Sequence, residues 1–256
     1  PARRSPAMWP VYVINMAENT ERLARVRAEL TKAGIEWERL EAVNGRSLSA
    51  SRLAEVYDGE ANRRRARHPL VPGEIGCYLS HLAAWQRLVD SDAPGAIVLE
   101  DDFRVDGNLA TVLEALERDD GEWELAKLFA FKPVALEGEV RDLVDGVRIG
   151  KPRRVPSTTL GYAIRRTGAE RLLVSSLPFC RPIDEDHKFY WETGLKIAMV
   201  DPVPLAMGTQ DTVSGTIGDA RRTANRDDTR PWAARVWAGV KYQARYRWGL
   251  WRARRS

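Results

Sequence analysis

The sequence predicts an α/β protein whose central sheet is mostly parallel and flanked by helices. Short apolar runs that are typical of buried strands alternate along the chain with longer segments whose apolar residues recur at helical spacing. No internal repeat appears. With 256 residues, of which 44% are hydrophobic, the chain has the length of one large domain, or of one domain with an appendage.

Apolar spacing and glycine turns define the elements of the first half. In order, we predict a strand over 11–15, a helix over 20–34, a strand over 37–43, a short helix over 48–57, an exposed basic loop over 62–68, a long helix over 73–90 and a strand over 96–99. Leu23, Val26 and Leu30 form the stripe of the first helix, which Gly34 ends. The turn dipeptide Asn44-Gly45 closes the second strand.

The second half continues the alternation but is less regular. We predict a helix over 109–117, strands over 125–131 and 160–164, a helix over 168–176 and a strand over 197–200. Residues 132–156 are polar and rich in Gly and Pro, which fits either a hairpin or a flexible loop. Residues 209–229 show no clear period and predict a mobile loop near the functional site.

Three adjacent acids, Glu100, Asp101 and Asp102, end the predicted buried strand 96–99. Acids this close repel one another, and their burial is unfavourable without a partner. A hard divalent cation, Mn²⁺ or Mg²⁺, is the usual compensation. Because side chains alternate along a strand, Glu100 and Asp102 share one side and are the predicted metal ligands. In an α/β protein a nucleotide's metal binds at this end of a strand; the alternative is a solvated acidic turn.

Six sequence blocks stand in a characteristic order along the chain: VYVIN (11–15) with Glu21-Arg22, GEIGCYLSH (73–81), VLEDD (98–102), LGYAI (160–164), PID (182–184) and SGTI (214–217). Together they resemble glycosyltransferase family 25, which includes bacterial lipopolysaccharide-core sugar transferases and collagen galactosyltransferases. The resemblance implies a GT-A fold, a nucleotide-sugar donor that is usually UDP-galactose or a relative, a manganese-type cation and inversion at the anomeric carbon. Residues 132–156, and everything after Gly218, match nothing in this pattern.

The resemblance also implies which residues contact the donor. They are Asn15, Arg22, Ser80, His81, Asp101, Gln210 and Ser214. Arg22 follows the first strand, where a nucleotide docks in an open α/β sheet. Ser80 and His81 lie in an apolar helix, so a satisfied core pair is the alternative. Asp101 is expected to reach the ribose or sugar, or else to be solvated, and Gln210 and Ser214 to close over the diphosphate.

An inverting transfer needs a base that takes the proton of the acceptor hydroxyl. Asp184 matches the family's Pro-x-Asp and is the predicted catalytic base, with Asp186 and His187 as substitutes. The alternative is an acidic helix N-terminus after a proline. Metal binding by Asp184 and His187 ranks lower, because the acids at 100–102 already serve that purpose.

The C-terminal segment differs in composition from the rest. Residues 231–256 contain seven Lys or Arg and no acid, which leaves 33 basic and 36 acidic residues, a net charge of −3, in residues 1–230. We therefore divide the chain into a GT-A-like domain, 1–230, and a basic, Trp-rich amphipathic helix, 231–256. One stripe of this helix is predicted to contain Ala233, Trp237, Val240, Ala244, Trp248 and Trp251.

This basic, Trp-rich helix suits an anionic membrane surface. Packing on the protein's own body is the alternative, and nucleic acid is disfavoured because the body is acidic. No apolar run is long enough for a membrane span, and the N-terminal residues do not resemble a signal peptide. The two cysteines, Cys77 and Cys180, are expected to be reduced. We expect a cytoplasmic protein, in one alternative peripheral to the inner membrane face.

Together these features predict a metal-dependent, inverting glycosyltransferase that moves a hexose, with galactose favoured, from a UDP-sugar to a hydroxyl of a saccharide acceptor such as the lipopolysaccharide core or a glycolipid. A peptide or a small natural product is an alternative acceptor. A metal-dependent hydrolase of sugar nucleotides and a non-catalytic sugar-nucleotide or membrane-binding module are the competing functions.

Overall fold

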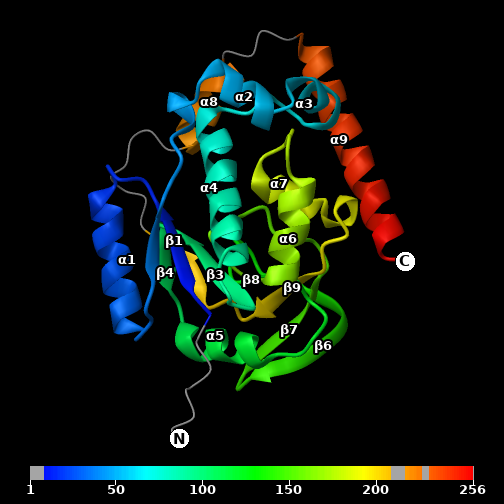
Figure 1. Cartoon of the computed structure of the whole chain (residues 1–256). Coiled ribbons are helices and arrows are strands. Elements are labelled where there is room, and N and C mark those ends of the chain that lie inside the picture. The colour runs from blue at the N-terminus through cyan, green and yellow to red at the C-terminus, as the bar shows by residue number, and fades with distance from the viewer. Residues whose placement is uncertain (1–8, 209–216, 227–230, 256) are drawn as a thin grey trace, which may run out of the picture.

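The structure is a computed structural model that describes residues 9–208, 217–226 and 231–255, and every structural statement below refers to these ranges. It confirms the α/β class: an eight-stranded sheet is flanked by helices (Figure 1), consistent with a GT-A-like fold. The strand order is β2-β1-β3-β8-β5-β9-β7-β6, and β4 pairs with β10 in a separate ribbon.

The bounds of the elements follow in chain order. The strands are β1 (Val11–Asn15), β2 (Glu38–Glu41), β3 (Gly95–Glu100), β4 (Phe103–Val105), β5 (Leu125–Lys127), β6 (Leu136–Val144), β7 (Val147–Pro152), β8 (Gly161–Arg165), β9 (Ile197–Asp201) and β10 (Leu205–Met207). The helices are α1 (Thr20–Lys32), α2 (Ala50–Val56), α3 (Gly59–Arg65), α4 (Pro72–Val89), α5 (Leu109–Arg118), α6 (Arg166–Ser175), α7 (Ile183–Lys188), α8 (Ile217–Arg226) and α9 (Trp232–Ala253), with short 3₁₀ turns η1 (Gly45–Ser47) and η2 (Tyr190–Glu192).

The sheet is mixed, with its parallel part at the N-terminal strands. Strands β2, β1 and β3 are parallel, and so are β5 and β9. Strand β8 lies antiparallel between β3 and β5, and the β6–β7 hairpin extends the far edge. In the register of β1 and β3, Ile14 lies opposite Glu100. The carboxyl ends of these two strands therefore meet at one edge of the sheet, with the acids next to Asn15.

Two hydrophobic layers cover the two faces of the sheet because side chains alternate along each strand. Tyr12 and Val98 point into one layer, which also contains the apolar sides of α4, α6 and α9. Val13 and Leu99 point into the other, which is completed by α1 and α5. The sheet is thus buried on both faces, which explains the continuous apolar runs of its central strands.

Several predicted elements are corrected by the structure. The segment 62–68 is not simply a loop, because α3 covers its first part: the Asp58 side chain caps this helix at Ala61 N (2.8 Å), and buried Asn62 donates to Cys180 O (2.8 Å). Residues 132–156 contain the β6–β7 hairpin, one of the two predicted possibilities. The strand predicted to reach residue 131 ends at Lys127. Within 209–229, residues 217–226 form helix α8 and not a loop.

The C-terminal helix is joined to the core. Tyr242, Tyr246 and Leu250 are buried in the same hydrophobic layer as α4 and α6. The alternative of packing on the body is therefore realised, through a different side of the helix from the predicted stripe. Among the described helices, none has the length and apolar character that crossing a membrane requires.

Candidate active site

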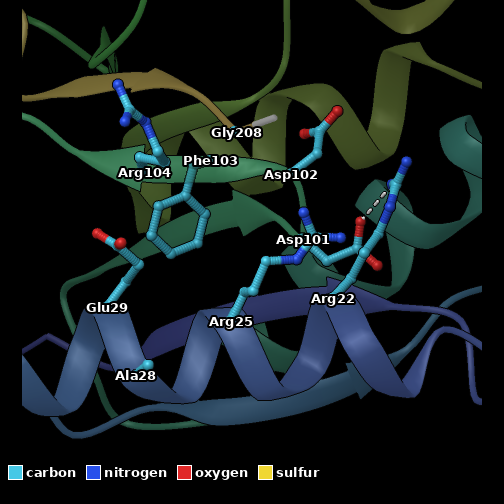
Figure 2. A pocket seen from close by; sticks show the side chains of 9 residues that line it. All are labelled: Arg22, Arg25, Ala28, Glu29, Asp101, Asp102, Phe103, Arg104 and Gly208. Atoms are coloured by element: carbon cyan, nitrogen blue, oxygen red, sulfur yellow. Dashed lines mark hydrogen bonds and ion pairs between the residues drawn. The ribbon is translucent and has the colours of Figure 1, made fainter. Parts of the chain in front are cut away.

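A cleft of about 640 Å³ opens at the edge where β1 and β3 end. Its walls come from the acidic residues after β3, the start of α1, the turn at η1, the cleft-facing side of α4 and helix α8. Lining residues include Asn19, Arg22, Cys77, Ser80, His81, Glu100, Asp101, Asp102, Ile217 and Arg222. A smaller cavity of about 120 Å³ lies on the α1 side and shares Arg22, Asp101 and Asp102 with the cleft (Figure 2).

Asp101 is held by two of the residues that were predicted to contact the donor. Arg22 Nη1 donates to Asp101 Oδ1 at 2.8 Å (Figure 2). Asn15 Nδ2 donates to Asp101 Oδ2 at 2.7 Å. Asn15 is itself oriented by Arg39 Nε, which donates to its Oδ1 at 2.9 Å. The structure thus brings Asn15, Arg22 and Asp101 together, and Asp101 is a paired, buried acid instead of a solvated one.

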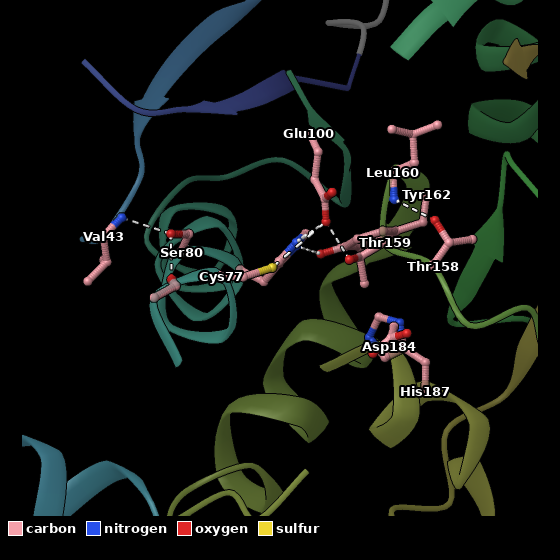
Figure 3. Close-up of polar contacts among 12 residues, drawn as sticks. Val43, Cys77, Ser80, Glu100, Thr158, Thr159, Leu160, Tyr162, Asp184 and His187 are labelled. Carbon is pink, nitrogen blue, oxygen red and sulfur yellow. Dashed lines mark hydrogen bonds and ion pairs between the residues drawn. The ribbon is translucent and has the colours of Figure 1, made fainter. Parts of the chain in front are cut away.

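Glu100 points into a separate hydrogen-bond network (Figure 3). His81 Nε2 lies 3.2 Å from Glu100 Oε1, the Thr159 hydroxyl donates to the same oxygen, and the Cys77 thiol lies 3.9 Å away. Burial alone would raise the pKa of Glu100, but these donors, with the charge of Lys127, outweigh it and lower the pKa. Glu100 is therefore a preorganised carboxylate that presents negative charge to the cleft.

Asp102 differs from the other two acids of the triplet in its hydrogen bonding. Its Oδ1 is buried, and no residue that the structure describes donates a hydrogen bond to this oxygen. Burial, reinforced by the nearby charge of Glu100, raises the pKa of Asp102 to about 7. The backbone is fixed by Gly208 N, which donates to Asp102 O at 2.6 Å, and a Cβ at position 208 would lie 2.7 Å from that oxygen. A buried, unpartnered carboxylate oxygen beside a second carboxylate is what a bound cation would satisfy.

The donor set fits a hard divalent cation. Glu100 and Asp102 both line the cleft and supply carboxylate oxygens, the ligands that Mn²⁺ and Mg²⁺ prefer. A second group, Cys77, His81 and Glu100, has ligand atoms within 4.8 Å of one another and a softer character. Burial, with the charge of Glu100, raises the pKa of the Cys77 thiol and so disfavours the thiolate that a soft metal needs. The pair Glu100 and Asp102 is the better candidate.

Ser80 and His81 lie at the cleft but already have protein partners. The Ser80 hydroxyl accepts from Val43 N (2.8 Å) and donates to Gly76 O (2.7 Å), which ties α4 to the segment after β2. Buried His81 contacts the Tyr162 hydroxyl through Nδ1 (2.8 Å) and Glu100 through Nε2. In this geometry Ser80 supports the cleft wall and His81 supports the orientation of Glu100. The contact of both residues with a nucleotide-sugar donor stays a prediction.

Asp184, on α7, interacts electrostatically with the buried side chain of Lys127. Lys127 ends β5 and is fully buried; its Nζ donates to Thr158 O (2.7 Å) and lies 2.8 Å from His187 Nδ1. Burial lowers the pKa of Lys127 to about 7, although Asp184 and Glu100 oppose this. Burial also raises the pKa of Asp184, and the charge of Lys127 counteracts it. Lys127 therefore interacts electrostatically with both Asp184 and Glu100.

Asp186 and His187, the other candidates for the catalytic base, already interact with neighbouring side chains. Asp186 accepts from the Tyr78 hydroxyl and from Arg181 Nε, both at 2.7 Å. His187 is buried against the Tyr162 and Trp85 rings and contacts Lys127. Burial, with the Lys127 charge, lowers the pKa of His187 well below its usual range. Asp184 Oδ1 accepts from the backbone N of Glu185 at 2.9 Å, and among the described residues no side chain donates a hydrogen bond to the Asp184 carboxylate.

Helix α8 contributes Ile217, Ala220 and Arg222 to the wall of the cleft. Arg221 pairs with Glu74 and lies 2.7 Å from His68 Nε2, which fastens α8 to the start of α4. Glu74 also accepts from Val71 N at 3.0 Å, so it is a helix-start acid, as its place in the first turn suggests. Gln210 and Ser214, predicted to close over the diphosphate, lie outside the described residues.

Sequence reasoning missed Lys127 and Thr159. A charged residue that directly follows the apolar pair Leu125-Ala126 was a signal for Lys127, because a lysine in an otherwise buried strand needs a partner. No comparable signal identified Thr159, whose contact with Glu100 depends on the antiparallel pairing of β3 and β8.

The domain is α/β and GT-A-like, and its acidic cleft lies at the carboxyl ends of adjacent parallel strands, which is where open α/β sheets bind their ligands. Residues 8–145 match the sequence profile of glycosyltransferase family 25 (LPS biosynthesis protein). The match covers more than half of the chain, and the chain therefore belongs to glycosyltransferase family 25.

Curated relatives agree with this assignment. The chain is 29% identical over 269 residues to procollagen galactosyltransferase 2 of Mus musculus, with 92% of this chain and 42% of that protein aligned. It is 33% identical over 183 residues to a glycosyltransferase 25 family member of Anopheles gambiae (68% and 30%). It is also 29% identical over 244 residues to the inactive glycosyltransferase 25 family member 3 of Mus musculus (87% and 40%). The chain thus spans less than half the length of these relatives.

Proposed function

We propose that this protein is an inverting glycosyltransferase that depends on a divalent cation. It moves a hexose, with galactose favoured, from a UDP-sugar to a hydroxyl of a saccharide acceptor such as the lipopolysaccharide core or a glycolipid. The observation that carries the proposal is the unpartnered Oδ1 of Asp102 beside the ordered carboxylate of Glu100 in the large cleft. Membership of the family and the galactosyltransferase names of its relatives support the reaction class.

In this proposal the acids and the first helix hold the donor. Glu100 and Asp102 bind Mn²⁺ or Mg²⁺, which neutralises charge on the leaving diphosphate when bound. Arg22 and Asn15 keep Asp101 in place at the cleft wall, where its carboxylate is available to a ribose or sugar hydroxyl. The nucleotide would lie along the start of α1, as ligands do at the carboxyl ends of parallel strands.

Asp184 acts as the base in this proposal. Its carboxylate takes the proton of the acceptor hydroxyl while the acceptor oxygen bonds to the anomeric carbon and the bond to the UDP oxygen breaks. Burial disfavours the charged form of Asp184, and buried Lys127 offsets that effect. Lys127 is thus a positioning residue whose charge favours the ionised form of the base.

The location and the acceptor belong to the same proposal. A glycolipid or saccharide acceptor fits a cytoplasmic enzyme that works next to the inner membrane face. A peptide acceptor is the second candidate, because relatives are named procollagen galactosyltransferases. Relatives named inactive make a non-catalytic role the third.

The proposal is tested by release of UDP from UDP-galactose in the presence of manganese, with and without saccharide acceptors. We expect release that depends on an acceptor, and a loss of about 100-fold or more in Asp184→Asn with UDP binding retained. Asp142→Asn, on the exposed β6, is the matched control. Acceptor-independent release would indicate a hydrolase, and donor binding without turnover in the wild type would indicate a non-catalytic module.

A further inference from the structure

Helix α9 buries one side against the body of the protein. Tyr242, Tyr246, Gly249 and Leu250 are the buried residues of this helix. The rings of Tyr242 and Tyr246 pack against Phe189, with centroids 5.4 and 5.6 Å apart. These residues are three or four positions apart, so they share one face of the helix.

The opposite side of α9 exposes large apolar side chains. Trp237, Val240, Trp248 and Trp251 recur at helical spacing, and each is half exposed or more (59, 50, 59 and 50%). We call these four residues the docking face. Of the eleven large hydrophobic side chains exposed in the described part of the chain, six belong to α9. Isolated exposed apolar residues are ordinary, but a row of tryptophans on one helix face marks an interaction surface.

Basic side chains lie on the docking face itself. Lys241 Nζ lies 5.5 Å from the Trp237 ring, and the Arg252 and Arg255 guanidinium groups lie 4.8 and 4.1 Å from the Trp248 and Trp251 rings. Residues 231–256 contain no acid. The docking face is therefore apolar and positively charged together.

A second basic segment lies beside α9. Helix α3 contacts α9 (Figure 1), and the Arg67 guanidinium, just after α3, lies 5.2 Å from the Tyr242 ring. Arg63, Arg64 and Arg65 are exposed on α3. The fold thus brings together two basic runs that are far apart in the sequence, which enlarges the positive region around the helix.

We propose that the docking face of α9 binds the surface of an anionic lipid bilayer, with the helix lying in the plane of the interface. Tryptophans favour the headgroup level, where their rings meet apolar chains and their N–H groups meet water, and lysine and arginine side chains attract anionic headgroups.

Charge disfavours two other possible partners of the docking face, a second copy of this chain and nucleic acid. A second copy of this chain, paired by two-fold symmetry, would place basic residues opposite basic residues. Nucleic acid is disfavoured because the remainder of the domain, residues 1–230, carries a net charge of −3. An anionic bilayer complements both the apolar side chains and the positive charge of the docking face.

The test is co-sedimentation of the full chain with vesicles of phosphatidylcholine alone and with added phosphatidylglycerol, at low and high salt. We expect binding to the anionic vesicles only, weakened by salt. Trp237→Ser with Trp248→Ser should weaken it about tenfold or more. Lys241→Glu with Arg252→Glu should weaken it about fivefold or more for each basic residue reversed.

Matched controls are Val174→Ser, an apolar residue of α6 that is 87% exposed, and Arg27→Glu with Lys32→Glu on α1; both should bind like the wild type. Four outcomes would overturn the proposal: no vesicle binding, equal binding to neutral vesicles, equal losses in the controls, or a wild-type dimer that the tryptophan substitutions dissociate. The readout involves neither UDP nor turnover, so it is independent of the proposed function.

Discussion

Asp102 carries a buried carboxylate oxygen, Oδ1, that receives no hydrogen bond from the described residues. Without a cation, burial, reinforced by the nearby charge of Glu100, raises its pKa from 3.8 to about 7. A carboxyl with a raised pKa in the folded state stabilises the fold fully below its unfolded pKa, and that contribution is lost as the pH rises through 7. The cation that we propose for this site would take the place of the proton and restore the stability.

We therefore predict that Asp102→Asn is more stable than the wild type at pH 8 in EDTA, by on the order of 2 kcal/mol, and that the difference shrinks toward pH 5. Urea unfolding at both pH values measures it, with Asp142→Asn as the matched control. Excess Mn²⁺ should stabilise the wild type more than Asp102→Asn, since a ligand that binds the folded state raises its stability. A difference that does not grow with pH would contradict the assignment.

The close contact between η1 and the start of α4 shapes the cleft wall. A Cβ added at Gly76 would overlap the Val43 carbonyl oxygen and lie 2.7 Å from Gly45 N. The segment after β2 can therefore approach α4 only because both positions are glycine, and this approach lets Ser80 reach Val43 N. Packing thus explains why the block GEIGCYLSH (73–81) has a glycine at position 76, in addition to the role predicted for this block at the site.

Gly76→Ala should destabilise the fold by about 1–3 kcal/mol, because the backbone segments must separate. Gly239→Ala is the matched control: it lies on α9 with no atom within 4 Å of an added Cβ, and should be neutral or stabilising by up to about 1 kcal/mol. Thermal unfolding of both variants measures the difference. Equal stabilities would show that the segments are not in close contact.

Local pattern predicted most of the sheet and the long helices, because strands buried on both faces are continuous apolar runs and α4 carries an unbroken apolar side. Local pattern did not predict the elements whose structure depends on contacts between residues that are remote in sequence. The arginines of α3 suggested a loop, yet an Asp58 cap and buried Asn62 hold a helix there. Helix α8 is fastened by Arg221 to Glu74, an ion pair between residues remote in sequence.

The same distinction holds for the site. Asn15, Arg22 and Asp101 could be predicted to meet because parallel strands end at one edge and α1 begins there. Lys127 and Thr159 reach the acids through the antiparallel pairing of β8 with β3 and β5, which the strand and helix alternation does not reveal. The same alternation of strands and helices along the chain would also have fitted a fully parallel sheet, in which these strands would have had different neighbouring strands.

The domain as a whole includes α9. Leu250 is 8% exposed in the main hydrophobic layer, whereas Trp248 is 59% exposed on the docking face. Leu250→Ala should cost about 2–4 kcal/mol of unfolding free energy, and Trp248→Ala should change it little. Urea unfolding followed by circular dichroism and by fluorescence measures both, and the two probes should coincide. Two separate transitions, or no effect of Leu250→Ala, would support an independent appendage from residue 231.

The central claim is that Glu100 and Asp102 bind the cation of a nucleotide donor. Calorimetric titration of UDP, with and without manganese, into the wild type, Asp102→Asn and the control Asp142→Asn tests it most directly. The account predicts manganese-dependent UDP binding in the wild type and the control, and its loss in Asp102→Asn. UDP binding that is equal in all three proteins with and without manganese, or absent from all, would contradict it.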